Sequence, residues 1–407
     1  MICESKMKFY LVSTKSVIMA KRKIWYVPSL RKEENEGISR DVSWLELFFD
    51  LFFVVVIARI AHDLANEVTS HGFLVYVASF FPIWWVWIGA TYYFERFETK
   101  GLDNRVFTFL LMIPVAGMAV FSHHSLTSNF DFFVGSYVFA RIMIAFLWGR
   151  ATYHDKEFRS VGIIFMIGFL IAVSFGFAAV WVESGLKYIL FGIALFLDFF
   201  APFFTVKKSK ALPKMSRSKL PERFGLFTVI VLGEVLVGII SGISALENPG
   251  IHILFGGVLG IFICFGLWWV YFDFVARRPF HDKMILQYAW AYLHMPLVMC
   301  IVALGAGLMN IVGNDGHFSD GVRQLVTGSF GGAIITIAII EIILERHDKE
   351  HTHKILSPLI KIICGMISLG IGIFAVHIHT IPLLIVFSLS LLVIMVYGAY
   401  MWFNQEI

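Results

Sequence analysis

The sequence predicts an all-α polytopic membrane protein of about twelve transmembrane helices, arranged as two parallel six-helix repeats with both termini cytoplasmic. Three observations predict this: the apolar segments, the placement of the basic residues, and a set of matches between the two halves of the chain. Hydrophobic residues make up 58% of the 407 positions, whereas a soluble domain carries about 45–50%.

A helix needs about 20 mostly apolar residues to cross the hydrocarbon core of a bilayer. Twelve segments of this kind follow one another along the chain. They span residues 43–64, 73–94, 106–126, 130–149, 161–182, 186–206, 224–245, 251–274, 284–312, 322–344, 357–377 and 381–403.

The basic residues predict how these segments are oriented. Twelve spans with a cytoplasmic N-terminus put all but four of the 33 Lys and Arg residues on the cytoplasmic side. The exceptions are Lys187 and Arg323 in outer loops and Arg59 and Arg141 within spans. Because cytoplasmic loops retain Lys and Arg during insertion, we expect a multi-pass protein of the plasma (inner) membrane with both ends inside.

Short matches between the halves predict an internal repeat. Trp84-Trp85-Val86 recurs as Trp268-Trp269-Val270, and Asp50 and Glu234 lie at the same separation. His154-Asp155-Lys156-Glu157 similarly recurs as His347-Asp348-Lys349-Glu350. Six spans is an even number, so both halves enter the membrane in the same direction, as in transporters built from parallel repeats.

The expected organisation therefore has five parts. They are a basic cytoplasmic tail at 1–42, a first repeat at 43–206, a basic linker at 207–223, a second repeat at 224–403, and a short tail at 404–407.

Ionisable residues inside the spans are the candidate site. An ionised group at the bilayer centre costs about 2.5–3.5 kcal/mol, so such residues line hydrated cavities, pair, or are protonated. We expect Glu46, Asp50, Glu234 and Arg141 to converge around one polar cavity between the halves, with His294 nearby. The alternative is a structural ion pair of Arg141 with Asp50 or Glu234.

Five further residues are secondary candidates. Asp198 and Glu341 lie nearer the cytoplasmic ends of their spans, and Trp84, Trp268 and Asp273 belong to the paired-tryptophan segments. For the tryptophans, ordinary helix packing is the alternative to an aromatic-lined site. The His123-His124 and His377/His379 clusters lack neighbouring ligands in sequence, so neither a metal nor a cofactor is predicted.

Four short stretches resemble the bacterial low temperature requirement A family. Trp44 to Leu51 matches the family's Trp-Leu-Glu-Leu-Phe-Phe-Asp-Leu pattern, and Glu222–Phe227 and Leu232–Glu234 match its Glu-Arg-Phe-Gly-Leu-Phe and Leu-Gly-Glu patterns. Trp268–Asp273 is similar to its Trp-Trp-x-x-Phe-Asp element, from which residues 92–98 of the second span depart. The resemblance implies an integral membrane protein linked by name to growth in the cold.

The sequence favours a secondary transporter of unknown substrate, coupled to protons or another cation through Glu46, Asp50 and Glu234. A channel or a structural membrane-stress protein is the alternative. A lipid-modifying enzyme ranks last, since no zinc, serine-hydrolase or kinase motif occurs. We therefore expect no enzymatic activity and no nucleic-acid partner. The expected partners are membrane lipids and a small-molecule or ion substrate, and a homo-oligomer is compatible with the sequence.

Overall fold

The computed structural model of the chain describes residues 24–30, 42–97, 101–209, 212, 215–313, 318–346 and 352–403. Within these ranges the protein is entirely helical, with twelve α-helices and one short π-helical segment, η1 (Phe272–Ala276), that continues α8. The α-helices are α1 (Trp44–Asn66), α2 (Ser70–Phe97), α3 (Leu102–Phe121), α4 (Phe130–His154), α5 (Arg159–Trp181), α6 (Leu186–Ser209), α7 (Lys219–Ser244), α8 (Ile251–Tyr271), α9 (Met284–Val312), α10 (Asp320–Ile343), α11 (Leu356–Phe374) and α12 (Thr380–Phe403).

Eleven of the described helices, α2 to α12, are long and apolar enough to cross a membrane. Helix α1 has a similar length but carries four charged residues, Glu46, Asp50, Arg59 and Asp63. It nevertheless packs on other helices of the bundle, and its Glu46 and Asp50 are buried. The all-helical membrane fold is thus confirmed, whereas the repeat and the side on which the termini lie stay predictions.

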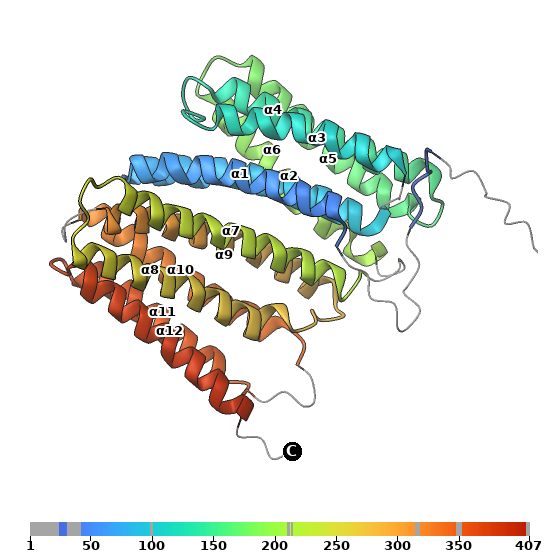
Figure 1. Cartoon of the computed structure of the whole chain (residues 1–407). Helices are drawn as coiled ribbons and strands as arrows, with labels where there is room; N and C mark the ends of the chain where they lie inside the picture. Colours follow the sequence, from blue (N-terminus) through green and yellow to red (C-terminus); the bar gives the residue numbers. More distant parts are fainter. Residues whose placement is uncertain are drawn as a thin grey trace, which may run out of the picture.

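The helices form an elongated bundle in which the two halves of the sequence lie beside each other (Figure 1). Helices α3 to α6 occupy one side and α8, α10, α11 and α12 the other, with α1, α2, α7 and α9 between them. The halves meet where α1 packs on α7 and α9, and where α2 and α6 pack on α9.

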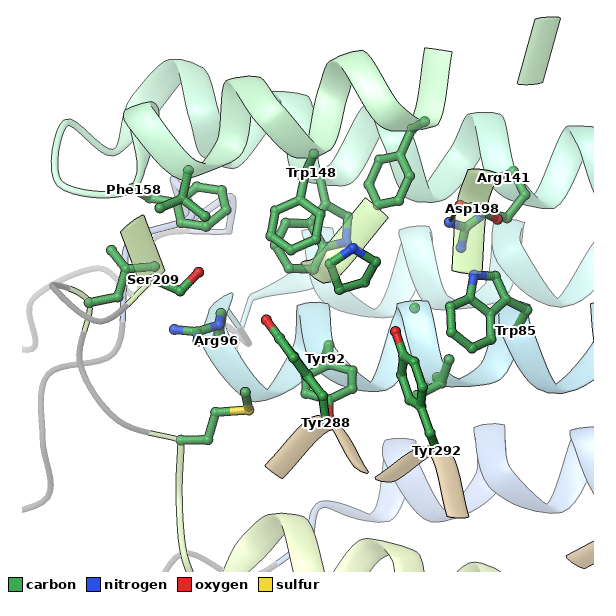
Figure 2. Close-up of a pocket in the computed structure, with 18 residues that line it drawn as sticks. Trp85, Tyr92, Arg96, Arg141, Trp148, Phe158, Asp198, Ser209, Tyr288 and Tyr292 are labelled. Carbon is green, nitrogen blue, oxygen red and sulfur yellow. Dashed lines mark hydrogen bonds and ion pairs between the residues drawn. The ribbon is translucent and has the colours of Figure 1, made fainter. Parts of the chain in front are cut away.

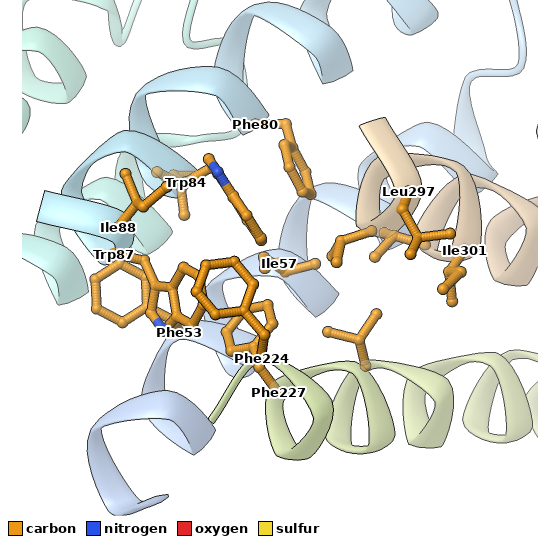
Figure 3. Close-up of a cluster of buried hydrophobic side chains, with 14 of the residues drawn as sticks. Phe53, Ile57, Phe80, Trp84, Trp87, Ile88, Phe224, Phe227, Leu297 and Ile301 are labelled. Atoms are coloured by element: carbon orange, nitrogen blue, oxygen red, sulfur yellow. The ribbon is translucent and has the colours of Figure 1, made fainter. Parts of the chain in front are cut away.

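Large apolar side chains fill this junction (Figure 3). Trp87 of α2 contacts Phe227 of α7 with 4.3 Å between ring centroids, and Phe224 of α7 contacts Trp290 of α9 at 4.6 Å. Phe53 and Ile57 of α1 are buried in the same cluster. A core of this size at the junction makes the halves one packed body.

Helices α7 and α9 approach closely because glycines face each other. A Cβ added at Gly238 would lie 2.7 Å from the carbonyl oxygen of Gly305, and one at Gly242 would lie 2.5 Å from that of Met309. Small residues let membrane helices pack backbone against backbone. The second half is therefore anchored to the junction through α7 and α9.

Residues 24–30 are the described part of the predicted N-terminal tail. Leu102 donates its backbone N–H to the carbonyl of Ile24 at 2.9 Å, and Leu30 donates to Asp155 at 2.7 Å. The rest of the tail, except residue 42, lies outside the described residues, as do residues 404–407 and the second copy of the His-Asp-Lys-Glu match.

We call the end of the bundle that holds the start of α7 and residues 215–218 the linker end. The starts of α1 and α9 lie at this end, and the turns at residues 122–129 and 67–69 lie at the opposite end.

Candidate functional site

An aromatic cavity extends from the middle of the bundle towards the linker end, with an empty volume of about 590 Å³. Its walls come from α2, α4, α5 and α6 of the first half and from α9 of the second. Arg141 and Asp198 line one end, and Arg96 and Ser209 line the other (Figure 2). Aromatic side chains lie between these ends, among them Trp148, Tyr92, Tyr288 and Tyr292.

Arg141 and Asp198 form a buried ion pair at the deep end of this aromatic cavity. The Nη2 atom of Arg141 donates to Oδ1 of Asp198, and the hydroxyl of Tyr137 donates to Oδ2 at 2.6 Å. The guanidinium also lies 4.7 Å from the centre of the Phe169 ring, a favourable cation–π geometry. Arg141 therefore pairs with neither Asp50 nor Glu234, and the expected alternative pairing is wrong.

Three buried polar atoms around this cavity have no hydrogen-bond partner among the described residues. They are Nη1 of Arg141, Nε1 of Trp148 and the hydroxyl oxygen of Tyr92. An unsatisfied buried donor costs about 1–3 kcal/mol. The cavity thus offers hydrogen-bond donors that the protein itself leaves unused.

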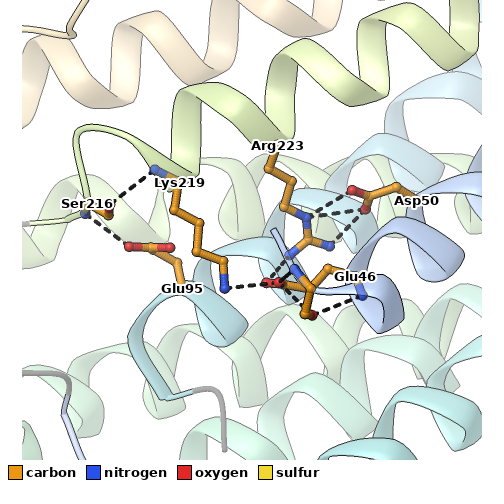
Figure 4. A network of polar contacts seen from close by, with 7 residues as sticks. Glu46, Asp50, Glu95, Ser216, Lys219 and Arg223 are labelled. Carbon is orange, nitrogen blue, oxygen red and sulfur yellow. Dashed lines mark hydrogen bonds and ion pairs between the residues drawn. The ribbon is translucent and has the colours of Figure 1, made fainter. Parts of the chain in front are cut away.

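A second cluster, which we call the interhelix network, joins the two halves at the linker end (Figure 4). Arg223 of α7 donates to both carboxylate oxygens of Asp50, through Nη2 at 2.8 Å and Nε at 3.0 Å. Lys219 lies 2.9 Å from Glu46, whose other oxygen is 3.3 Å from Arg223. Trp87 donates its indole N–H to Asp50 at 2.8 Å.

The local sequence explains this geometry. Glu46 and Asp50 are four residues apart on α1, and Lys219 and Arg223 are four apart on α7, so each pair projects from one helix face. Ser43 caps α1 and donates its backbone N–H to Glu46 at 3.0 Å, which fixes the carboxylate at the first turn. In these contacts Glu46 and Asp50 of α1 face Lys219 and Arg223 of α7.

The basic partners were not predicted, because Lys219 and Arg223 fall in the linker expected at 207–223 and the seventh span was expected to begin at residue 224. Helix α7 in fact begins at Lys219. The available signal was the four-residue spacing of the two cations, which matches the spacing of the acids on α1.

A third cluster lies within the second half, around Glu341 of α10. Lys361 of α11 donates to Glu341 at 2.9 Å, Ser357 donates to it at 2.6 Å, and Arg278 lies 3.1 Å away. All of these side chains are buried. Glu341 is therefore part of a compensated internal cluster and lies apart from the other predicted acids.

Glu234 differs from the other acids. It is partly exposed on α7, and no described residue forms a hydrogen bond or ion pair with its carboxylate. The predicted convergence of Glu46, Asp50, Glu234 and Arg141 on one cavity is therefore not found. Glu46 and Asp50 lie together and pair with α7, Arg141 pairs with Asp198 of α6, and Glu234 belongs to neither cluster.

His294 and the tryptophan candidates belong to the packed core or its surface. His294 is fully buried and contacts the Tyr271 hydroxyl at 3.1 Å and the Trp290 carbonyl at 2.7 Å. Trp84 is buried in the junction, whereas Trp268 is 40% exposed. Asp273 lies in η1, 3.2 Å from Arg277.

Comparison with known proteins identifies the family. The model of the bacterial low temperature requirement A protein family matches residues 41–399. The chain belongs to this family. It is also 25% identical over 339 residues to an uncharacterized protein of Rhizobium meliloti (strain 1021), a match covering 76% of this chain and 78% of that protein.

Two of the stretches that match patterns of the low temperature requirement A family contact each other in the interhelix network. The Trp44–Leu51 stretch supplies Glu46 and Asp50, and the Glu222–Phe227 stretch supplies Arg223. Two patterns that are far apart in the sequence therefore act as one structural unit.

Proposed function

We propose that this low temperature requirement A protein is a secondary transporter of the inner membrane, coupled to protons or another cation. The main support for the proposal is the contact between α2 and α9, one of the places where the two halves of the chain meet. We call this line of contact the α2–α9 seam. Trp85 and Tyr92 of α2 and Tyr288 and Tyr292 of α9 line the aromatic cavity along this seam.

A second hollow lies on the same seam, towards the opposite end. It has an empty volume of about 1020 Å³ and is lined by Phe73 and Tyr76 of α2 and by Met299 and Cys300 of α9, with residues of α10. Between the hollow and the cavity, the Tyr76 hydroxyl donates to the Met299 carbonyl at 2.8 Å, and Phe81 stacks on Trp85.

A binding site that opens alternately to the two sides of a membrane needs one hollow towards each side. It also needs a layer of packed side chains that separates the two hollows. Residues 76 and 85 of α2 mark the two sides of the layer, about 13 Å apart at 1.5 Å per residue. Rocking of one half against the other is the usual route to alternating access. The interhelix network would then break and re-form at the linker end.

Two further observations support the proposal. Five pairs of neighbours within the first half, α1–α2, α1–α3, α3–α4, α4–α5 and α5–α6, have counterparts in α7–α8, α7–α9, α9–α10, α10–α11 and α11–α12, whereas the α2–α4 and α8–α12 contacts have no counterpart of similar extent. Glu234 is an intramembrane acid without a counter-charge, and such acids are typical of proton relays. We take Glu234 to be the coupling acid.

A structural membrane protein without a transport cycle is the second candidate. The full compensation of Glu46 and Asp50 by Lys219 and Arg223 favours it, because a balanced buried network can simply fix helix packing.

Proteoliposomes that contain a pH-sensitive dye would separate the candidates. Carboxylates, amines, amino acids and sugars are added one at a time outside. A transporter gives proton influx that depends on one class of solute and saturates. A channel gives influx without saturation, and a structural protein gives none with any solute.

A further inference from the structure

We propose that residues 24–30, which we call the strap, close the linker end of the aromatic cavity, and that detachment of the strap opens this end. The strap has neither helix nor strand structure and lies against the first half of the bundle. Closure of the cavity is argued from the contacts of the strap alone. Control of solute flux by the strap rests, in addition, on the proposed transport function.

The backbone of the strap is bound at both of its ends. The carbonyl of Ile24 accepts the N–H of Leu102, the first residue of α3, at 2.9 Å. Leu30 donates its N–H to Oδ2 of Asp155, the residue that follows α4, at 2.7 Å. The strap therefore crosses from the start of α3 to the end of α4, both of which lie at the linker end.

Side chains hold the middle of the strap. Arg150 of α4 donates to the carbonyl of Tyr26, and its guanidinium lies 5.5 Å from the centre of the Trp25 ring. The Trp25 ring also meets the Phe107 ring of α3 edge-on, with 5.6 Å between the centroids. Trp25 is 50% exposed, and cation–π contacts and hydrogen bonds of this kind are individually weak. The strap can therefore detach while the helices stay packed.

Asp155 connects the strap to the wall of the aromatic cavity. Its Oδ2 accepts from Leu30, and its Oδ1 accepts the N–H of Phe158 at 3.0 Å. Phe158 is fully buried and lines the cavity at the same end as Ser209 (Figure 2). Its ring packs on Phe97 of α2 with 4.9 Å between the centroids. One carboxylate thus holds both the strap and a side chain of the cavity wall.

The short connection between α4 and α5 makes this link effective. Only residues 155–158 lie between the two helices, so a displacement of Asp155 also displaces Phe158. While the strap is bound, Leu30 fixes the carboxylate and the connection stays against the bundle. When the strap detaches, the carboxylate loses that donor, and the connection moves outwards together with Phe158.

Gly101 offers a way to detach the strap by substitution. It precedes α3 with an extended backbone that any residue adopts. A Cβ at this position would lie 2.5 Å from Cδ2 of Tyr26 and 3.2 Å from the carbonyl oxygen of Ile24. It would also meet the carboxylate of Asp103, which accepts the N–H of Tyr26 at 3.4 Å. Gly101→Val therefore displaces the strap without changing a charge or a residue of the cavity.

A second variant detaches the strap by another route. Trp25→Ala removes the ring contacts with Arg150 and Phe107 and leaves the backbone contacts in place. Each variant has a matched control. Gly185→Val adds a side chain where a Cβ meets nothing within 4 Å, and Trp181→Ala removes a tryptophan that is 73% exposed.

Amide hydrogen exchange of the purified protein in nanodiscs tests the link from strap to wall. We expect faster exchange at residues 24–30 and 155–158 in Gly101→Val and Trp25→Ala, and wild-type exchange in both controls. Exchange within α10 at the wild-type rate shows that the bundle is folded. If Gly101→Val unfolds the protein, Trp25→Ala decides, because Trp25 is half exposed. Faster exchange at 24–30 without any change at 155–158 would overturn the inference, as would wild-type exchange at 24–30 in both variants.

Opening of the cavity is measured with Ser209→Cys in a protein whose four native cysteines are replaced. Ser209 is 2% exposed and lines the linker end of the cavity. Its replacement by Cys should react with a small maleimide at least tenfold faster when Gly101→Val is added, and at the same rate when Gly185→Val is added. An unchanged rate in a protein whose strap has detached would contradict the proposed closure.

The rate of this labelling is independent of transport, so the two proposals can fail separately. Faster labelling in a protein that moves no solute supports the strap and contradicts transport. Solute-driven proton influx, together with unchanged labelling after detachment of the strap, supports transport and contradicts the strap.

Discussion

Arg223 contacts Glu46 and Asp50 of α1 and its side chain is 2% exposed, so the charge balance of the interhelix network depends on it. Replacing Arg223 by Met removes the cation that pairs with Asp50 and leaves Lys219 as the described cation beside Glu46. Removal of one partner from a buried ion pair costs about 3–5 kcal/mol. We therefore expect a clear fall in the thermal unfolding temperature of the Arg223→Met protein.

Arg217→Met is the matched control for that experiment. Arg217 also pairs with two acids, Asp282 and Glu345, but its side chain is 44% exposed. An exposed pair contributes about 0–1 kcal/mol. Equal losses of thermal stability in the two variants would contradict the buried network.

Removing the charge of Glu234 and removing that of Glu341 should have opposite effects on the thermal unfolding temperature. Glu234→Gln removes an uncompensated intramembrane charge and should leave the unfolding temperature unchanged or raised. Glu341→Gln leaves Lys361 and Arg278 without their acid and should lower it. Thermal unfolding in one detergent measures both, and a strong loss in Glu234→Gln would reveal a partner for that acid.

At the scale of single residues, the sequence could indicate which side chains are costly in a membrane but could not indicate how they pair. Glu46 and Asp50 were predictable as one helix face from their spacing. The pairing of Asp50 with Arg223, 173 positions away, follows from the contact of α1 with α7, which no local pattern encodes.

At the scale of helices, the contact of α7 with α9 depends on glycine. In Gly238→Ala the new methyl group meets the Gly305 carbonyl at 2.7 Å, so the two backbones must separate. Overpacking of this kind costs about 1–3 kcal/mol. We expect reduced thermal stability for Gly238→Ala and none of that loss for Gly233→Ala, whose Cβ meets nothing within 4 Å.

The existence of the helices was predictable from length and hydropathy, while their ends were not. Hydropathy predicts that the linker ends at residue 223, yet α7 begins at Lys219. The two charged residues of its first turns, Lys219 and Arg223, are buried against acids of α1. The sequence alone does not distinguish a loop from a helical turn whose charges are neutralised by side chains of a neighbouring helix.

At the scale of the whole molecule, the basic residues predict orientation. In a protein whose four native cysteines are replaced, a cysteine at Asn129 or Gly313 should react with an impermeant maleimide added to intact cells. A cysteine at Arg277, whose side chain is 69% exposed, should react only after the cells are opened. Outside labelling at Arg277 would reverse the predicted topology.

Cation-coupled transport through the α2–α9 seam, with Glu234 as the coupling acid, is the function that we propose. Its most direct test is the comparison of two fluxes in Glu234→Gln proteoliposomes, using whichever solute drives proton influx in the wild-type protein. The first flux is uptake against a solute gradient, driven by a pH gradient, and the second is solute exchange at equal pH. We expect the variant to keep exchange and to lose uphill uptake, because the carrier still moves cargo without a proton. Uphill uptake at the wild-type level in Glu234→Gln would contradict it.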